Sequence, residues 1–321
     1  MGAQSAVADG LFPALEPYCC TWLNTGGSHR IYVEESGNPE GLPVLFVHGG
    51  PGSCSRPIHR RFFDPGVFRI VLFDQRGCGQ STPAGCAHDN TTAHLIADIE
   101  CIRNALGVRQ WLLFGGSWSS TLSLGYAIAH PRSVAGMVLR GVFLGSRDEV
   151  DWFLRGVRHF VPEAWAAFSA DAGDDLLAYY RRQLQSADTA IALTAARRWS
   201  EYESRVISPG SWPANSSSDP AESLLTSIGI QIQYLSNDFY LRPGELLDNL
   251  WRIAHLPCVI VQGRLDMVCP PVTAALVAKM LPRSELRWVA DGGHNALQPA
   301  MAVELVSAAR QCGERLGREG K

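Results

Sequence analysis

The chain has 321 residues, of which 46% are hydrophobic and 18% are charged, and its formal net charge is −3. This composition is that of a globular protein able to bury a large core, and it argues against a disordered chain, a coiled coil or a nucleic-acid-binding protein. No stretch is apolar and long enough to span a membrane, and the first ten residues lack the pattern of a secretory signal.

Strand-like and helix-like segments alternate at both ends of the chain. Strands are expected at 31–35, 43–47, 69–73, 110–114, 134–139, 257–261 and 285–289, and helices at 95–106, 272–280 and 301–316. Such alternation is typical of a mostly parallel sheet that helices cover on both faces.

The middle of the chain has a different pattern. Trp, Tyr, Arg and Ala recur there at helical spacing, with one loop-like tract at 208–220. We expect a helical insertion over the sheet. The predicted division is a core domain of residues 1–146 and 249–321 and a helical cap domain of residues 147–248.

The sequence GGSWS at 115–119 follows a strand-like run and precedes a helix-like one. In the pattern G-x-S-x-G, a strained turn between a strand and a helix exposes a nucleophilic serine. Ser119 stands here in place of the last glycine. Because serine is small, we expect it to fit the turn and leave Ser117 a working nucleophile.

Three further motifs follow predicted strands, at the sheet edge where ligands bind. They are HGGPG at 48–52, Asp266 in GRLD and His294 in DGGH. With Ser117 they give the order Ser, Asp, His of the α/β-hydrolases. We predict that Ser117 is the nucleophile, His294 the general base, and Asp266 the carboxylate that orients the imidazole.

Charge that develops on a substrate oxygen needs preset donors, and the N–H groups of Gly50 and Trp118 are the candidates for this oxyanion hole. Each motif alone has a structural explanation, since most histidines and G-x-S turns are not catalytic. Their combination after the right strands favours catalysis. We interpret His48 as a residue that structures its loop, and DQRGCGQS at 74–81 as the pocket floor.

The nine cysteines are scattered, odd in number and without C-x-x-C spacing. This argues against a disulfide framework or a zinc site. Reduced thiols in a cytosolic protein explain them better, so we expect cytoplasmic localisation. The sequence leaves open whether any cysteine lines the site and what the oligomeric state is.

The chain resembles the proline iminopeptidases, a branch of the α/β-hydrolases, over almost its whole length. The matching motifs are HGGPG at 48–52, DQRGCGQS at 74–81, NTT at 90–92, LFGGSW at 113–118, LRGVFL at 139–144, GRLD at 263–266 and GGH at 292–294. The resemblance implies an α/β-hydrolase fold, a mostly parallel sheet flanked by helices with an inserted helical cap. It also implies release of N-terminal proline from a peptide, without a metal or cofactor.

In that family a Trp-x-x-aromatic-Glu phrase of the cap supplies a carboxylate for the amine of the substrate. The phrase WSEYE at 199–203 makes Glu203 the matching residue. A protonated amine taken out of water must be paired, or its burial costs several kcal/mol. Most glutamates on helices are simply solvated, and that alternative stays open for Glu203.

The substrate pocket departs from the family at two positions. On the same match, Gln231 replaces a second cap glutamate and Leu235 replaces an aromatic residue beside the proline ring, while Phe143 and Trp152 remain. One carboxylate fewer weakens the hold on a cationic amine, and the lost ring loosens the fit to proline.

Three functions follow from these observations. The first is a serine aminopeptidase that acts, through an acyl-enzyme, on short peptides or amides with N-terminal proline or a similar small residue. The second, motivated by Gln231 and Leu235, is an esterase, amidase or acyl-transferring enzyme of specialised metabolism. The third is a catalytically silent binding protein, against which the intact Ser117, Asp266 and His294 argue. A small peptide or amide is the expected partner, rather than nucleic acid or a membrane.

Overall fold

The computed structural model describes residues 10–209 and 220–319. In this part of the chain eight strands form one sheet in the order β1-β2-β4-β3-β5-β6-β7-β8. The pairs β1–β2 and β2–β4 are antiparallel, and the other pairs are parallel. The prediction of a mostly parallel sheet is therefore confirmed.

The strands have the following bounds: β1 (Cys19–Asn24), β2 (Arg30–Gly37), β3 (Leu42–Val47), β4 (Phe68–Phe73), β5 (Trp111–Ser117), β6 (Val134–Val142), β7 (Cys258–Gly263) and β8 (Ser284–Val289). Every strand predicted from the sequence is present. The additional strand is β1, which lies at the edge of the sheet and is mostly exposed, so its sequence lacks the apolar pattern that marks the others.

Helices outside the insertion are α1 (Thr92–Ala105), α2 (Trp118–Ala129), α9 (Pro271–Met280) and α10 (Pro299–Glu319). The insertion between β6 and β7 holds α3 (Arg147–Leu154), α4 (Pro162–Ser169), α5 (Leu176–Leu184), α6 (Thr189–Ile207), α7 (Ala221–Ser236) and α8 (Glu245–Asn249). Short 3₁₀ helices are η1 (Pro57–Phe62), η2 (Pro131–Ser133), η3 (Gly156–His159), η4 (Asp238–Tyr240) and η5 (Leu250–Ile253). None of the helices in the described residues is long and apolar enough to cross a membrane.

The sheet separates two hydrophobic clusters because successive residues of a strand point to opposite faces. In β3, Leu45 and Val47 belong to the cluster that includes residues of α1 and α2. Val44 and Phe46, from the same strand, belong to the cluster that includes residues of α10. Both faces of the sheet are thus covered, as the apolar strands require.

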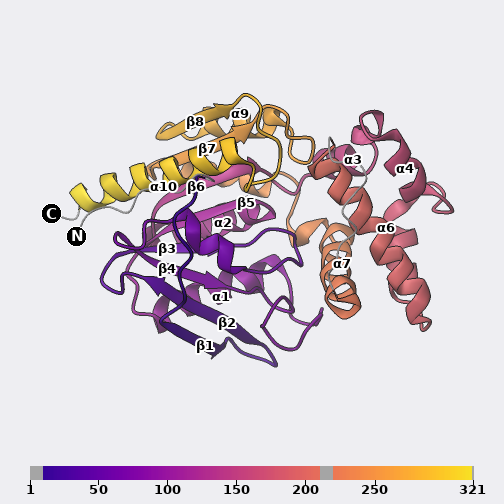
Figure 1. Cartoon of the computed structure of the whole chain (residues 1–321), viewed down its shortest axis with the longest axis horizontal. Coiled ribbons are helices and arrows are strands. Elements are labelled where there is room, and N and C mark those ends of the chain that lie inside the picture. The colour runs from indigo at the N-terminus through magenta and orange to yellow at the C-terminus, as the bar shows by residue number, and fades with distance from the viewer. Residues whose placement is uncertain (1–9, 210–219, 320–321) are drawn as a thin grey trace.

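The helices α3, α4, α6 and α7 lie to one side of the sheet (Figure 1). Aromatic rings form much of their mutual packing: Phe168 stacks on Tyr202 and on Tyr180 at centroid distances of 4.1 and 4.8 Å. Residues 210–219 of the predicted loop-like tract lie outside the described residues.

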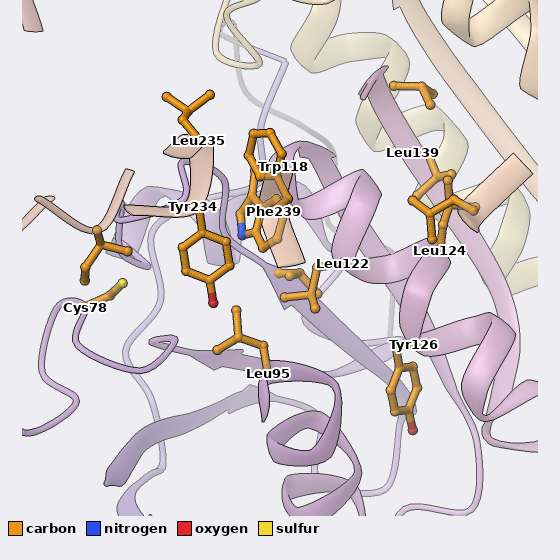
Figure 2. Close-up of a cluster of buried hydrophobic side chains, with 14 of the residues drawn as sticks. Cys78, Leu95, Trp118, Leu122, Leu124, Tyr126, Leu139, Tyr234, Leu235 and Phe239 are labelled. Carbon is orange, nitrogen blue, oxygen red and sulfur yellow. The ribbon is translucent and has the colours of Figure 1, made fainter. Parts of the chain in front are cut away.

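The helix α7 packs on the helix that follows Ser117. Figure 2 shows Tyr234 beside Trp118 and Phe239, and their ring centroids are 5.0 Å apart for Tyr234–Trp118 and 5.5 Å apart for Trp118–Phe239. The Tyr234 hydroxyl donates to Asn90 Oδ1 over 2.9 Å. These contacts fix the inserted helices above the carboxyl ends of the strands.

Candidate active site

Ser117 is the last residue of β5 and directly precedes α2, with φ 60° and ψ −133°. A positive φ is costly for a residue with a side chain and is found at strained functional turns. The two preceding glycines leave no room for a Cβ, which would lie 2.8 Å from Ser119 Oγ at Gly115 and 2.6 Å from Arg140 Nε at Gly116. Because the chain passes close to Ser119 and Arg140 at these glycines, the turn can present Ser117 at the carboxyl end of β5.

Ser119 forms part of the same turn. Its buried hydroxyl accepts from the Gly116 N–H and lies 2.7 Å from that nitrogen and 2.7 Å from the Gly116 carbonyl oxygen, to which it donates. The residue is inside α2 and not among the residues with positive φ. Serine therefore fits where the common pattern has glycine, and it ties the start of the helix to the strand.

His294 and Asp266 form a buried pair. The imidazole Nδ1 lies 2.9 Å from Asp266 Oδ2 and 3.0 Å from Oδ1. Because a carboxylate only accepts, Nδ1 carries the proton, which leaves Nε2 as the basic nitrogen. Asp266 Oδ1 also accepts from the N–H groups of Val268 and Cys269 at 3.0 and 2.8 Å.

Burial and charge set the protonation of this pair. Burial alone would raise the pKa of Asp266, but the charge and hydrogen bond of His294, together with the Arg140 cation, hold that pKa below its usual value. Burial lowers the pKa of His294 against the opposing effect of Asp266. At neutral pH the imidazole is therefore neutral and able to accept a proton.

The segment LRGVFL positions the pair, a role that the sequence did not reveal. Arg140 Nη1 donates to the His294 carbonyl oxygen over 2.6 Å. Gly141 has φ 51°, and a Cβ there would lie 2.9 Å from Asp266 Oδ2 and 3.3 Å from His294 Nδ1. Its only signal in the sequence was the match of LRGVFL, at the carboxyl end of β6, to a motif of the proline iminopeptidases.

Ser117 and His294 line one cavity of about 750 Å³. The Ser117 hydroxyl lies 4.0 Å from Cys269 Sγ, and among the described residues it makes no hydrogen bond to the His294 ring. Hydrogen bonds of this kind often tighten only when substrate binds. The cavity brings nucleophile and base to the same space, without a preformed bond between them.

The loop HGGPG bends toward the cavity at Gly50, where φ is 117° and a Cβ would lie 2.7 Å from the nitrogens of Gly52 and Ser53. Trp118 is the first residue of α2, so its N–H has no partner within the helix. Gly50 lines the cavity. Of the two residues predicted for the oxyanion hole, Gly50 lines the same cavity as Ser117, and Trp118 follows Ser117 in the chain.

His48 structures this loop. Its Nδ1 lies 3.0 Å from the Gly49 carbonyl oxygen, and its Nε2 accepts from the Gln75 N–H over 2.9 Å. The Gln75 amide also donates to the His48 carbonyl oxygen over 2.8 Å and accepts from the Trp118 indole over 2.9 Å. Gln75 thereby joins the loop to α2.

The segment DQRGCGQS contributes less to the pocket than predicted. Arg76 forms a buried ion pair with Asp98, with both nitrogen–oxygen distances at 2.7 Å, and it does not line the cavity. Asp74 accepts from the N–H and hydroxyl of Ser55. Gly79 lines the cavity as predicted, whereas the interpretation of Arg76 as pocket floor is wrong, because a buried guanidinium requires a carboxylate partner.

The predicted substrate-binding residues divide into two groups. Glu203, Gln231, Leu235 and Phe143 line the cavity with Ser117, whereas Trp152 does not. The Trp152 indole donates to the Met267 carbonyl oxygen over 2.8 Å. Aromatic residues that the sequence did not single out also line the cavity, among them Phe153 and Phe239 from the insertion.

Glu203 is linked to two other residues of the inserted helices. The Gln231 amide donates to Glu203 Oε1 over 2.7 Å and accepts from the Trp199 indole over 2.9 Å. Because an indole N–H only donates, it fixes the orientation of the Gln231 amide. Burial raises the pKa of Glu203, and the Gln231 hydrogen bond only partly opposes this.

Two cysteines, Cys54 and Cys269, line the cavity, and the buried Cys78 does not. Burial raises the pKa of the Cys269 thiol well above its usual value. This answers the question that the sequence left open about cysteines at the site.

Comparison with protein families matches residues 43–298 to the alpha/beta hydrolase fold. A probable proline iminopeptidase from Leptolyngbya boryana is 42% identical, over 93% of this chain and 95% of its own length. The proline iminopeptidase from Neisseria gonorrhoeae is also 42% identical, over 95% of this chain and 100% of its own. The similarity therefore includes the inserted helices as well as the sheet.

Solved structures show the same fold. The proline iminopeptidase from Mycobacterium smegmatis has a TM-score of 0.64 at 17% identity, covering 94% of this chain and 100% of its own. The esterase RhEst1 from Rhodococcus sp. ECU1013 has a TM-score of 0.63 at 19% identity, covering 93% and 99%. At identities this low, structural similarity is evidence for a shared fold and not for a shared function.

Proposed function

The chain belongs to the proline iminopeptidase family of the α/β-hydrolases, and from this premise we propose that it is a serine aminopeptidase. Its substrates are short peptides or amides with N-terminal proline or a similar small residue. The observation that carries the proposal is the Glu203 carboxylate in the cavity that Ser117 and His294 line. An aminopeptidase needs such a negative group near its nucleophile, whereas a simple esterase does not.

In the proposed reaction, Ser117 Oγ attacks the carbonyl carbon of the first residue while His294 Nε2 takes the hydroxyl proton. Asp266 keeps the other imidazole proton on Nδ1 and stabilises the cation that forms. His294 then gives its proton to the leaving amine, and the acyl-enzyme remains on Ser117. A water molecule attacks this ester with His294 again as base, which releases the amino acid.

The negative charge that forms on the carbonyl oxygen requires donors already in place. We assign this role to the N–H groups of Gly50, which lines the cavity with Ser117, and of Trp118, the next residue in the chain. The helix start at Trp118 supports the assignment because it leaves that N–H without a helical partner, and the positive φ of Gly50, at 117°, gives its loop a turn that favours glycine. Preset donors of this kind typically contribute a factor of about 10² to 10³ each.

The amine of the substrate is assigned to Glu203. Gln231 occupies Oε1, and no hydrogen bond to Oε2 occurs among the described residues. A substrate ammonium can pair with that free oxygen. This restricts the enzyme to unblocked N-termini, since an acylated nitrogen carries no charge to offset the buried carboxylate.

The domain division is part of the same proposal. Residues 1–146 and 249–321 form the core domain with the nucleophile, base and orienting carboxylate, and residues 147–248 form the cap with Glu203 and Gln231. The packing of Tyr234 on Trp118 supports a cap that closes one end of the cavity. A closed end favours removal of single N-terminal residues over cleavage within a chain.

Hydrolysis of a matched substrate panel tests the function. The panel holds the arylamides of proline and alanine, the arylamide of N-acetylproline and a simple aryl ester, with Ser117→Ala as the inactive control. We expect the highest kcat/KM for unblocked proline arylamide and loss of all turnover in the control. Equal turnover of the blocked and unblocked proline substrates would contradict the proposal.

A second candidate is an esterase or amidase that has lost the preference for amines. The replacement of a carboxylate by Gln231 and of an aromatic wall by Leu235 favours it, because both changes weaken recognition of a cyclic ammonium. Its signature in the same panel is ester turnover that greatly exceeds turnover of every unblocked arylamide.

A further inference from the structure

The cavity extends beyond the space that faces the inserted helices. Part of its wall consists of Phe153, Leu235 and Phe239, which belong to the cluster that includes residues of α1 and α2. Another part, here called the second arm, is lined by residues near η1 and α10: Phe46, His59, Phe62, Phe114, Leu297 and Leu305. The four apolar residues Phe46, Phe62, Phe114 and Leu305 belong to the other cluster. The cavity therefore reaches around the end of the sheet to its other face.

Chain connectivity places the second arm beside the reacting atoms. Phe114 precedes Ser117 by three residues on β5 and pairs in register with Phe46 on the neighbouring β3. Leu297 follows His294 by three residues in the loop after β8. The amine subsite at Glu203 comes instead from α6 in the insertion. Ser117 and His294 thus lie between two chemically different parts of one cavity.

The wall of the second arm is aromatic. The His59 ring stacks on Phe46 with a centroid distance of 4.4 Å, and Phe46 stacks on Phe114 at 6.0 Å. Burial, with the charge of Arg56 as a lesser cause, lowers the pKa of His59 to about 3. His59 is neutral at physiological pH, so this wall suits an aromatic or aliphatic group.

The cation Arg56 lies beside His59 of this wall. Arg56 lines the cavity, is exposed, and its backbone N–H donates to His59 Nδ1 over 3.0 Å. It forms none of the ion pairs found within residues 10–209 and 220–319. Three carboxylates line the cavity: Glu203 on α6, Glu222 on α7, and Glu149, which is held by the N–H groups of Leu144 and Ser146.

We propose that the second arm binds the residue that follows the released one, and that Arg56 pairs with the C-terminal carboxylate when that residue is the last. This rests on the proposed function. The volume of about 750 Å³ is in the range that encloses a whole small ligand rather than one side chain. The preferred substrates are therefore dipeptides in which a large apolar residue follows the N-terminal one.

The test compares three substrates, Pro-Phe, Pro-Gly and Pro-Phe amide, on the full-length protein. Burial of the phenyl ring predicts a kcat/KM for Pro-Phe at least about tenfold above that for Pro-Gly. Arg56→Gln should lower kcat/KM for Pro-Phe by about threefold to fivefold, as expected for an exposed ion pair, and leave Pro-Phe amide unchanged. Arg132→Gln, at another exposed arginine that does not line the cavity, is the matched control and should change neither value.

A second variant tests the wall independently of the cation. Ala296→Phe places a ring beside Leu297 in the loop that lines the arm, and it should lower kcat/KM for Pro-Phe more than for Pro-Gly. Equal turnover of Pro-Phe and Pro-Gly in every variant would overturn the second arm as a subsite. No turnover of any proline peptide by wild type would instead refute the proposed function.

Discussion

The Gln231 amide donates to the Glu203 carboxylate over 2.7 Å, within the cavity that also holds Ser117. The side chain at position 231 therefore occupies one oxygen of the only carboxylate assigned here to the substrate amine. It adds no negative charge of its own. The charge pairing assigned to the substrate amine then depends on Glu203.

The first prediction concerns that dependence. Glu203→Gln should reduce kcat/KM for proline arylamide by at least about thirtyfold, mainly through a higher KM, because the buried ammonium loses its partner. Turnover of a simple aryl ester should stay within about threefold. Steady-state kinetics on both substrates checks this. Glu201→Gln, at an exposed position of the same helix, is the control, and an equal loss in both variants would exclude the assigned role.

The second prediction concerns pH. Burial raises the pKa of Glu203, so its carboxylate is lost as the pH falls through a value above the usual 4.5. Burial also lowers the pKa of His294, so this base stays neutral to a pH below the usual 6.5. Cleavage of an aminoacyl arylamide requires both groups deprotonated, Glu203 to bind the amine and His294 to act as base, whereas cleavage of an ester requires only His294.

On the acid side, log kcat/KM for proline arylamide should therefore reach a slope of about two per pH unit, and that for an aryl ester about one. In Glu203→Gln both substrates should show a slope of about one. Profiles measured in constant-ionic-strength buffers distinguish these cases. Identical slopes for both substrates in the wild type would mean that Glu203 does not need its charge.

Much of this site could be predicted because its residues follow buried parallel strands. The apolar runs of β3, β5 and β7 are near-continuous, and the chemistry-bearing residues come directly after them. Motif order then suggested Ser117, Asp266 and His294, and the structure places the last two in contact. The local sequence was sufficient to predict these catalytic residues because each motif lies at or near the end of a strand.

Other features depend on three-dimensional packing that no local pattern records. Trp152 and Phe153 are neighbours on α3, and successive helical residues point about 100° apart, so a match by sequence could not say which one faces the cavity. The contact of Arg140 with the His294 carbonyl oxygen joins residues 154 positions apart. The edge strand β1 lacks an apolar pattern because most of its side chains are exposed.

The third prediction concerns the elbow. Ser119→Ala removes two hydrogen bonds to Gly116 and should lower the free energy of unfolding by about 1–2 kcal/mol, with kcat/KM within a few fold of the wild type. Ser123→Ala is the control on the same helix. Its hydroxyl is buried without a partner among the described residues, so its removal should cost less than about 0.5 kcal/mol or stabilise the fold.

Denaturant unfolding of the three proteins measures this difference. An equal effect at the two positions would mean that the hydrogen bonds of Ser119 do not support the turn. Loss of activity in Ser119→Ala with unchanged stability would instead assign the hydroxyl a direct part in catalysis.

The fourth prediction concerns Cys269, whose sulfur lies 4.0 Å from the Ser117 hydroxyl oxygen. The test uses a methylthiolating reagent. Because burial raises the pKa of the Cys269 thiol, this thiol should react with the reagent at neutral pH at least about tenfold more slowly than an exposed cysteine, and the reaction should become faster as the pH rises. Once a methylthio group is attached, it should fill the space beside Ser117 and abolish turnover. Mass spectrometry of peptides, followed in parallel with residual activity, measures both rates.

Two alanine variants identify the cysteine responsible, since Cys54 also lines the cavity. Cys269→Ala should keep most of its activity and resist the reagent, because the Asp266 carboxylate is held by the backbone N–H at position 269 rather than by the thiol. Cys54→Ala should lose activity at the wild-type rate. The opposite pattern, in which Cys54→Ala keeps its activity in the reagent and Cys269→Ala loses it, would contradict the prediction. It would mean that modification of Cys54, in the loop near Gly50, causes the inactivation.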